Sequence, residues 1–266
     1  MAINTCRQGT IEYLTADGIG APHGFTTRLG GVSKPPLDSL NLGMHRGDDP
    51  RNVEENYRRL AEAIGFKKEK LVLTRQTHSD IVRKVTYEDA AGLDNHSYPE
   101  CDALITNTPG TALAVFTADC TPVLLYDPVT GAVGAAHAGW RGTAAKIAGK
   151  TAKAMCDAYG CRPENIRAAI GPNIGFCCFE TDADVPEAMI KAYGDEAESY
   201  IASKGEKYYV NLKELNALAL RQVGVTHIEI AEECTVCQCH RFWSHRVTGG
   251  NRGSQGAIIV CKEVCR

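Results

Sequence analysis

The sequence lacks an apolar run approaching the roughly 20 residues that a bilayer-spanning helix needs, which excludes a transmembrane helix. It also lacks a block of lysine and arginine. Basic residues number 29 against 32 acidic ones, so the basic footprint of a nucleic-acid-binding protein is missing. No internal repeat, low-complexity linker or secretory signal pattern is present. These absences predict a cytoplasmic protein without nucleic acid or membrane as a partner.

The length and composition predict one globular unit. A folded chain of 266 residues, 44% of them hydrophobic, buries about 70–75% of the surface that its unfolded form exposes. We therefore expect a single domain over residues 1–266. The 12 cysteines would suggest disulfides in a short secreted chain. Here we expect reduced thiols, most of them buried as small apolar groups and a minority binding metal.

Periodicity and turn residues predict a mixture of helices and strands. Asp49 and Pro50 suit the start of a helix that ends before Gly65. Residues 23–36 are expected to be rich in loops, because glycines and prolines punctuate them. The helices are expected at 50–64, 143–159, 184–193 and 212–222, and the strands at 70–74, 81–86, 103–106, 112–117, 122–126, 132–136, 166–170, 226–231 and 256–260. This order predicts a mixed α/β (α+β) fold with a single-domain layered architecture, in which helices cover mixed β-sheets.

Three potential metal ligands follow predicted strands. They are His78, Cys120 and His137, and the ends of strands are favoured places for functional groups. Two imidazoles and a thiolate suit zinc, and three protein ligands leave one tetrahedral position open, as in catalytic sites. The alternative is a structural role, with a buried core cysteine and two hydrogen-bonded histidines.

The segment after His137 predicts an anion site. Gly139, Gly142 and Thr143 form a turn into a helix, whose first N–H groups attract anions. Arg141 in this turn is able to bind phosphate with two hydrogen bonds. The alternative is a plain turn with a solvated arginine.

The chain closely resembles the YfiH family, also called laccase-domain or polyphenol oxidase proteins. The resemblance spans about residues 22 to 260. The motifs that carry it are Phe25-Thr26-Thr27-Arg28, Gly30-Gly31-Val32-Ser33, Leu40-Asn41-Leu42-Gly43, Gly47-Asp48-Asp49-Pro50, Gln76 with His78, Thr117-Ala118-Asp119-Cys120, His137-Ala138-Gly139-Trp140-Arg141-Gly142, Ile170-Gly171-Pro172 and Cys234-Thr235.

The resemblance implies a mixed α/β fold and a metal site at His78, Cys120 and His137. It implies phosphorolysis of adenosine, inosine and methylthioadenosine and deamination of adenosine, so the chain would be both a transferase and a hydrolase. The partners would be a nucleoside and phosphate. Zinc is the expected metal and copper the alternative, because Cu²⁺ binds such ligands more tightly. Editing of peptidoglycan precursors and copper-dependent phenol oxidation are the other activities attached to the family.

Roles for further residues follow from these chemistries. Asp119 is a candidate for proton transfer or, alternatively, a turn-stabilising carboxylate. We assign the phosphate-binding and catalytic cations to Arg28, Arg141 and Arg246, and substrate binding to Gln76, Asn41 and Ser244. The sequence departs from the family pattern at His245, where a tyrosine is usual, at Val247, where an arginine is usual, and at Ser79, where a glycine is usual.

Two other hypotheses use cysteine differently. Cys120 as nucleophile and His137 as base would make a metal-free hydrolase. A laccase needs further histidines for several copper centres, whereas the histidines outside the matched site are scattered along this sequence. We therefore rank laccase chemistry below nucleoside chemistry and cell-wall editing. Separately, Cys234, Cys237, Cys239 and His240 resemble half of a zinc knuckle or a redox pair. Cys261 and Cys265 lie nearby, and Cys177-Cys178 forms another dense pair. An additional structural zinc or a reversible disulfide is the hypothesis for this cluster.

Overall fold

Two six-stranded sheets form the centre of the molecule. A computed structural model describes residues 2–93 and 98–262. The first sheet has the strand order β1-β2-β3-β15-β7-β4. Its strands are β1 (Ile3–Gln8), β2 (Ile11–Ala16), β3 (His23–Thr26), β4 (Leu71–Val72), β7 (Ala112–Thr117) and β15 (Gln255–Val260). All pairs are antiparallel except β4 with β7.

The second sheet has the order β14-β10-β8-β9-β6-β5. Its strands are β5 (Val82–Lys84), β6 (Ala103–Thr106), β8 (Thr121–Tyr126), β9 (Val133–Ala138), β10 (Arg167–Ile170) and β14 (His227–Ile230). The central strands pair antiparallel, whereas β5 and β14 at the two edges pair parallel to their neighbours. The fold is therefore the mixed α+β fold that the sequence predicts.

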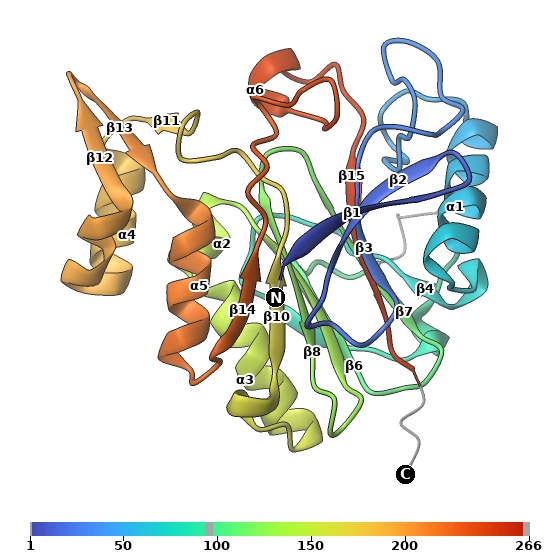
Figure 1. Ribbon diagram of the computed structural model, residues 1–266, viewed down its shortest axis with the longest axis horizontal. Helices are drawn as coiled ribbons and strands as arrows, with labels where there is room; N and C mark the ends of the chain where they lie inside the picture. The colour runs from blue at the N-terminus through green and yellow to red at the C-terminus, as the bar shows by residue number, and fades with distance from the viewer. Residues whose placement is uncertain (1, 94–97, 263–266) are drawn as a thin grey trace.

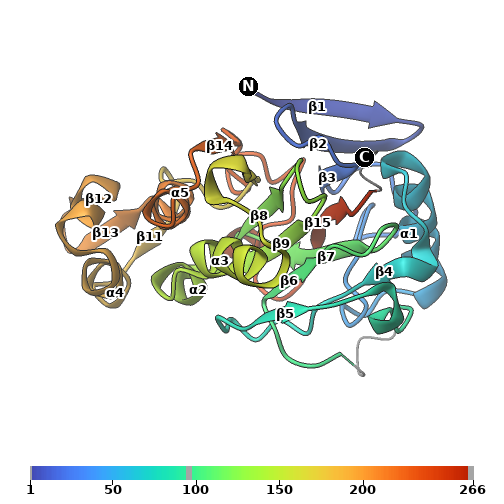
Figure 2. The ribbon, with the colours of Figure 1, turned by 90° about the horizontal axis from the view of Figure 1, so that it is seen from below.

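Helices cover the outer faces of the two sheets, as Figures 1 and 2 show. Helix α1 (Pro50–Ile64) lies beside the first sheet, and α3 (Ile147–Tyr159) and α5 (Leu212–Gln222) lie on the second. The remaining helices are α2 (Trp140–Ala144), α4 (Asp184–Tyr193) and α6 (His245–Thr248). Short 3-10 turns span Lys68–Lys70, Tyr87–Asp89, Pro163–Asn165 and Gly194–Tyr200. A three-stranded sheet of β11 (Glu180–Thr181), β13 (Lys207–Val210) and β12 (Ile201–Lys204) accompanies α4.

Alternation along the strands fills the core on both sides of the second sheet. In β8, Leu124 joins the apolar cluster shared with the first sheet, whereas Val123 and Leu125 join the cluster shared with α3. Met155 of α3 is fully buried in that second cluster. A strand buried on both faces reads as a continuous apolar run, which explains why β8 is easily recognised in the sequence.

Local sequence signals set the helix ends. The Asp49 side chain accepts a hydrogen bond from the backbone N–H of Arg51, Pro50 starts α1, and Gly65 ends it with φ of 89°. The predicted bounds 50–64, 184–193 and 212–222 are confirmed. The helix expected at 143–159 divides into α2 and α3, because Lys146 adopts a left-handed backbone conformation.

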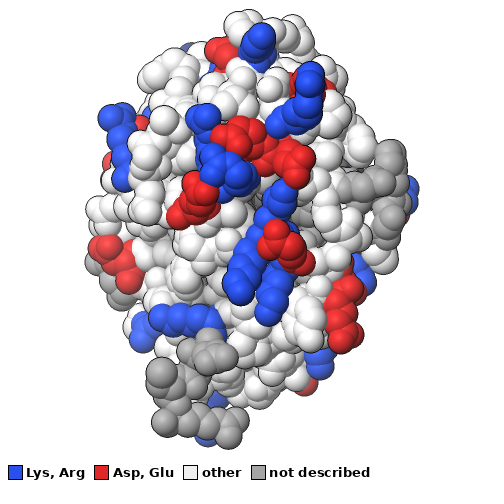
Figure 3. All heavy atoms as spheres, turned by 90° about the vertical axis from the view of Figure 1, so that its right-hand side faces the viewer, with Lys and Arg blue, Asp and Glu red and all other residues white. Residues whose placement is uncertain are grey.

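The N-terminal part differs from the expectation. The sequence predicts no strand there, yet β1 and β2 form a hairpin and β3 lies inside the segment expected to be loop-rich. Buried Glu12 in β2 is held by Arg7 and Arg241, so an ion pair occupies a position where an apolar residue would signal a strand. The surface beside α1 carries interleaved acidic and basic side chains (Figure 3), including the pairs of Glu55 with Arg58 and Arg59. In the described part of the chain, no helix combines the length and apolarity that a bilayer crossing needs.

Candidate metal and substrate site

Two crossings between the sheets bring the predicted ligands together. The chain passes from β4 in the first sheet to β5 in the second, and His78 lies in this link. It passes again from β7 to β8, and Cys120 ends this second link. His137 lies within β9, opposite Pro122 of β8. The sequence places His137 just after its strand, whereas β9 extends through Ala138.

The three side chains converge on one point. Their ligand atoms all lie within 4.8 Å of one another. Cys120 Sγ is 3.8 Å from His78 Nε2, and the two imidazole rings meet edge to face with centroids 5.0 Å apart. His137 is buried, Cys120 is half-buried and His78 is exposed. This gradient opens the site to one side, as a catalytic metal site with a free coordination position requires.

Asp102 anchors two of the three ligands. Its fully buried carboxylate accepts a 2.7 Å hydrogen bond from His137 Nδ1, which leaves Nε2 directed to the site. The same carboxylate accepts hydrogen bonds from the backbone N–H groups of Thr77, His78 and Ser79 and from the Ser79 hydroxyl. These bonds hold the loop on which His78 adopts φ of 59°. Carboxylates that orient ligating histidines in this way are typical of metal sites.

The electrostatics favour a thiolate at Cys120. Burial alone would raise the pKa of this thiol, but His137 and His78 lower it to about 6. Burial would lower the pKa of His137, whereas Cys120 and Asp102 raise it to about 9. Burial would raise the pKa of Asp102, but its hydrogen bonds with His137 and Ser79 lower it to about 2. These interactions favour the charged forms of Cys120, His137 and Asp102 over their neutral forms.

Gly139 permits this close packing. A Cβ atom at this position would lie 2.7 Å from His78 Cδ2 and 3.3 Å from Cys120 Sγ. Real Cβ atoms do not approach other heavy atoms as closely as the first distance, so any larger residue would push the imidazole away. The glycine that the sequence suggests for an anion-binding turn thus has a steric role next to the ligands. Helix α2, which begins directly after Gly139, has only five residues. The anion site expected at its start stays a prediction.

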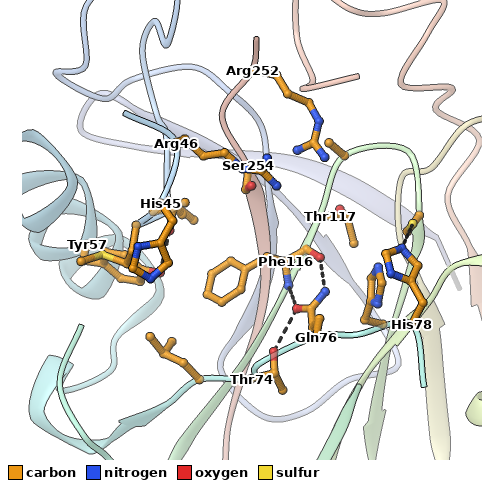
Figure 4. Close-up of a pocket in the computed structure, with 17 residues that line it drawn as sticks. His45, Arg46, Tyr57, Thr74, Gln76, His78, Phe116, Thr117, Arg252 and Ser254 are labelled. Carbon is orange, nitrogen blue, oxygen red and sulfur yellow. Dashed lines mark hydrogen bonds between the residues drawn. The ribbon is translucent and has the colours of Figure 1, made fainter. Parts of the chain in front are cut away.

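A pocket of about 390 Å³ opens directly beside the three ligands (Figure 4). His78, Cys120 and His137 form one end. Apolar walls come from Met44, Leu73 and Phe116. This volume is typical of small-molecule sites, and most of the lining side chains are polar or charged.

Two arginines enter the same pocket away from the ligands. Arg46 and Arg252 both line it, and Figure 4 shows their guanidinium groups on the same side of Phe116. Burial and the charge of Arg46 lower the pKa of Arg252 to about 10. Arg252 also donates to the Gly253 carbonyl and to His245 Nδ1. Two cations placed together at a cavity are an electrostatic setting for a polyvalent anion such as phosphate.

Gln76 lines this pocket, as its assignment to substrate binding requires, but its amide is engaged with the backbone. It accepts from the Phe116 N–H and donates to the Phe116 carbonyl, both at 2.7 Å. Asn41 is buried next to the pocket, where it accepts from the N–H groups of Gly43 and Ser254 and donates to Asp48. Gln76 therefore forms part of the pocket wall, whereas Asn41 holds the lining residues Gly43 and Ser254, and direct contact with a substrate stays a prediction for both.

Asp119 and Ser244 lie behind the site and bind each other. Asp119 has φ of 83°, and its carboxylate accepts from Thr235 Oγ1, Ser244 Oγ and the N–H of Arg246. Ser244 is buried and caps α6. The alternative of Asp119 as a stabiliser of backbone structure matches these contacts, and its role in proton transfer stays a prediction.

The three arginines that the sequence suggests for phosphate lie outside the pocket lining. Arg28 stacks on Trp243 at 3.9 Å and donates to the carbonyls of Asp38 and Cys239. Arg141 is exposed and stacks on Trp140 at 4.2 Å. Arg246 donates to the carbonyls of Cys178 and Glu180. Arg46 and Arg252, which sequence reasoning missed, are the arginines that line it. No local motif marks them, because only the fold brings them together.

Comparison with known proteins assigns the chain to a family. A family model described as multi-copper polyphenol oxidoreductase laccase matches residues 22–262. A protein named purine nucleoside phosphorylase YlmD, from Geobacillus stearothermophilus, is 40% identical over 250 residues, which cover 92% of this chain and 91% of the relative. The chain belongs to this laccase-domain family.

Another member of the laccase-domain family, named purine nucleoside phosphorylase YfiH, from Escherichia coli, is 42% identical over 221 residues, covering 83% of this chain and 86% of the relative. The crystal structure of YlmD from Geobacillus stearothermophilus superimposes with a TM-score of 0.91 at 38% identity, covering 98% of this chain and 99% of that one. The predicted resemblance to YfiH and the predicted fold class are therefore confirmed.

Proposed function

We propose that the pocket beside His78, Cys120 and His137 carries out zinc-dependent phosphorolysis of purine nucleosides, with adenosine, inosine and methylthioadenosine as substrates. The observation that carries this proposal is the placement of two arginines and a His-Cys-His group in one pocket of about 390 Å³. The names of the curated relatives YlmD and YfiH support it.

The walls suit the two substrates of this reaction. Arg46 and Arg252 supply positive charge for phosphate, whose oxygen displaces the purine from the sugar carbon C1′ to give the sugar 1-phosphate and the free base, which takes up the proton that phosphate loses. Phe116 offers a ring face beside the cavity, and Met44 and Leu73 supply apolar surface for the base. The arginines would also hold the phosphate in a fixed orientation through charge-assisted hydrogen bonds.

The residues fit a metal ion. The ligand atoms of His78, Cys120 and His137 lie close enough to share one ion, and Asp102 fixes the His137 tautomer so that Nε2 is free to ligate. A thiolate and two imidazoles favour zinc, and copper is the alternative. Zinc with an open position supplies Lewis-acid activation of water or of a substrate atom.

Deamination of adenosine is the second candidate activity. It needs activated water next to the purine carbon that carries the amino group. The open side of the His78, Cys120 and His137 group faces the pocket, which favours this reaction at the same site. Asp119, next to Cys120, is the predicted proton carrier for it, and its carboxylate accepts from Thr235 and Ser244.

Other activities give different outcomes in the same assays. The lowered pKa of Cys120 suits a metal-free hydrolase in which this thiolate attacks and His137 acts as the acid–base group. Editing of peptidoglycan precursors would give turnover of those precursors without nucleoside turnover. Copper-dependent phenol oxidation is not favoured, because the curated relatives that match along most of this chain are named for nucleoside phosphorolysis.

The test is the phosphate dependence of inosine and adenosine cleavage in the zinc-loaded full-length protein. We expect release of the free base only with phosphate, and Arg252→Gln should raise the KM for phosphate about tenfold or more while the KM for the nucleoside changes little. Arg28→Gln is the comparison, since Arg28 lies outside the pocket lining. Base release independent of phosphate, or a larger phosphate effect in Arg28→Gln, would refute the assignment of Arg46 and Arg252.

A further inference from the structure

A second cysteine group lies at the junction of two segments that are distant in the sequence. The loop between β10 and β11 carries Cys177 and Cys178, and the link between β14 and α6 carries Cys234 and Cys237. The two segments are joined next to Cys234. Asn173 forms a parallel β-bridge with Cys234, and the Asn173 carbonyl accepts a hydrogen bond from the N–H of Thr235. The second half of the C-x-x-C pattern is thus the Cys177–Cys178 pair.

The neighbours that the sequence suggests for this cluster lie elsewhere. Cys239 and His240 do not belong to the four-sulfur group, and Cys261 is buried with its thiol directed to the Gly131 carbonyl. Cys265 lies outside the described residues.

The sulfur atoms are spaced for one metal ion. Cys237 Sγ lies 3.6 Å from Cys177 Sγ and 3.5 Å from Cys178 Sγ, and all four sulfurs lie within 4.8 Å of one another. A tetrahedral site with Zn–S bonds of about 2.3 Å has sulfurs about 3.8 Å apart. A disulfide needs an S–S distance of about 2.05 Å, so these cysteines are free thiols arranged around a common centre.

The backbone prepares Cys234 to bind as a thiolate. The N–H of Gly175 donates to Cys234 Sγ at 3.2 Å, and the N–H groups of Val236 and Cys237 also face this sulfur. Donors fixed in the backbone favour the charged form of a sulfur ligand. Gly175 favours the approach, because a Cβ there would lie 3.0 Å from Cys234 Cβ and 3.2 Å from the sulfurs of Cys177 and Cys234, so these atoms would have to shift by a few tenths of an ångström.

We propose that this group is a closed structural zinc site, distinct from the catalytic centre, with four thiolate ligands: Cys177, Cys178, Cys234 and Cys237. Four protein ligands leave no position for water or substrate, which is the pattern of structural zinc. Each thiol releases its proton to solvent on binding, so the loaded site carries a formal charge of about −2. The half-exposed position of the group gives the ion a path of entry.

Basic groups nearby oppose that charge. The buried ammonium of Lys213 donates to the carbonyls of Ala231 and Glu233, directly before Cys234, and interacts electrostatically with Cys234 and Cys177. The Arg246 guanidinium donates to the Cys178 carbonyl. The ammonium of Lys213 already interacts with the charge of Glu233, and it gains further counter-charges when the thiolates are formed.

The site also positions the catalytic centre. Thr235 lies between two of the ligands and donates to Asp119, the residue before Cys120. Asp119 in turn accepts from Ser244 and the N–H of Arg246, on the segment that follows the C-x-x-C turn. Zinc at the four sulfurs therefore fixes the backbone that holds Asp119, without touching the substrate pocket.

Metal content separates the two sites. Full-length protein prepared with a reductant and zinc should contain about two zinc ions per chain, and Cys237→Ser and Cys120→Ala should each lose about one. Cys239→Ser is the matched control, since Cys239 lies in the same turn outside the group, and it should retain both ions. If the catalytic centre is metal-free, wild type contains about one ion, which Cys120→Ala retains and Cys237→Ser loses. Equal zinc in wild type and Cys237→Ser overturns the proposal.

A measurement on the unaltered chain avoids any folding defect of the variants. Iodoacetamide labelling with peptide mass analysis should find Cys177 and Cys237, the two exposed members, protected in zinc-loaded protein and reactive after zinc is removed by a chelator. Cobalt(II) added to the stripped protein should give the intense absorption of a tetrahedral thiolate site, and Cys237→Ser should lose most of it. Labelling that the chelator does not change, or a Cys177–Cys237 or Cys178–Cys237 disulfide in its place, would contradict the zinc site.

Discussion

Replacing Asp102 by asparagine should weaken metal binding and loosen the loop that carries His78. The carboxylate accepts five hydrogen bonds, from His137 Nδ1, three backbone N–H groups and the Ser79 hydroxyl. An asparagine offers only one acceptor oxygen in place of two. In one orientation the asparagine NH2 group faces His137 and the His78 N–H, and in the other it faces the N–H groups of Thr77 and Ser79. In either orientation, a donor therefore faces other donors.

The magnitude follows from those contacts. Two N–H groups lose their acceptor, at a cost of about 1–3 kcal/mol each. Thr77 is exposed, so water replaces part of the loss and the fall in unfolding free energy should lie near the lower end, at about 2 kcal/mol. Changes to the carboxylate behind a ligating histidine weaken metal binding by about 10–100-fold, or about 1.4–2.7 kcal/mol. Because Asp102 holds two ligand-bearing segments, we expect the upper part of that range.

The assay is a competition titration of zinc against a chromophoric chelator, together with urea unfolding of the same samples. Asp127→Asn is the matched control. Asp127 is equally buried, but it accepts from Val129 and Thr130 in the turn between β8 and β9, at the opposite end of these strands. Its variant should bind zinc as wild type does. If Asp102→Asn retains wild-type zinc affinity, or Asp127→Asn loses as much, the orienting role of Asp102 is refuted.

Three further predictions concern the same pocket. In chelator-treated protein, alkylation of Cys120 by iodoacetamide should rise with pH and level off above a midpoint of about 6, because the thiolate is the nucleophile. Cys156, whose pKa is raised by burial, should react only at alkaline pH. A midpoint near 9 for Cys120 would contradict its ion pair with His137. Gly139→Ala should lower zinc affinity about tenfold or more, since its Cβ would displace His78, whereas Gly160→Ala at the end of α3 should affect stability alone; equal zinc affinity in the two variants counts against the steric role. Phe116→Ala should raise the KM for inosine more than the KM for phosphate, as read from initial rates, and the reverse order would place the base elsewhere.

The sequence predicts those elements whose stability depends on local signals. Helices α1, α4 and α5 have their predicted bounds, because apolar spacing acts within each segment and the side chains of Asp49 and Asn211 cap α1 and α5. The hairpin of β1 and β2 escapes prediction because β1 is largely polar and exposed, and because Glu12 is buried against arginines from β1 and from a distant turn. Pairing of strands decides their existence, and pairing is not a local property.

The residues of the candidate site also divide into those that local sequence motifs predict and those that only the fold brings together. His78, Cys120 and His137 belong to motifs long enough to be recognised, and the fold brings them together. Asp102 gives no such signal, since an aspartate before a strand is usually part of a turn. Arg46 and Arg252 meet only because β15 and the segment before α1 reach the same pocket. The pairing of Cys234 and Cys237 with Cys177 and Cys178 is likewise set by the bridge between Asn173 and Cys234, so the sequence names both cysteine pairs but does not join them.

The most direct test of the central claim joins metal content to phosphate-dependent turnover in one set of samples. Purified wild-type protein and Cys120→Ala should be analysed for zinc while the release of hypoxanthine from inosine is followed with and without phosphate. We expect Cys120→Ala to lose about one zinc per chain relative to wild type and to lose phosphate-dependent turnover with it. Full turnover by zinc-free wild type, or no nucleoside turnover by zinc-loaded protein, would contradict the claim.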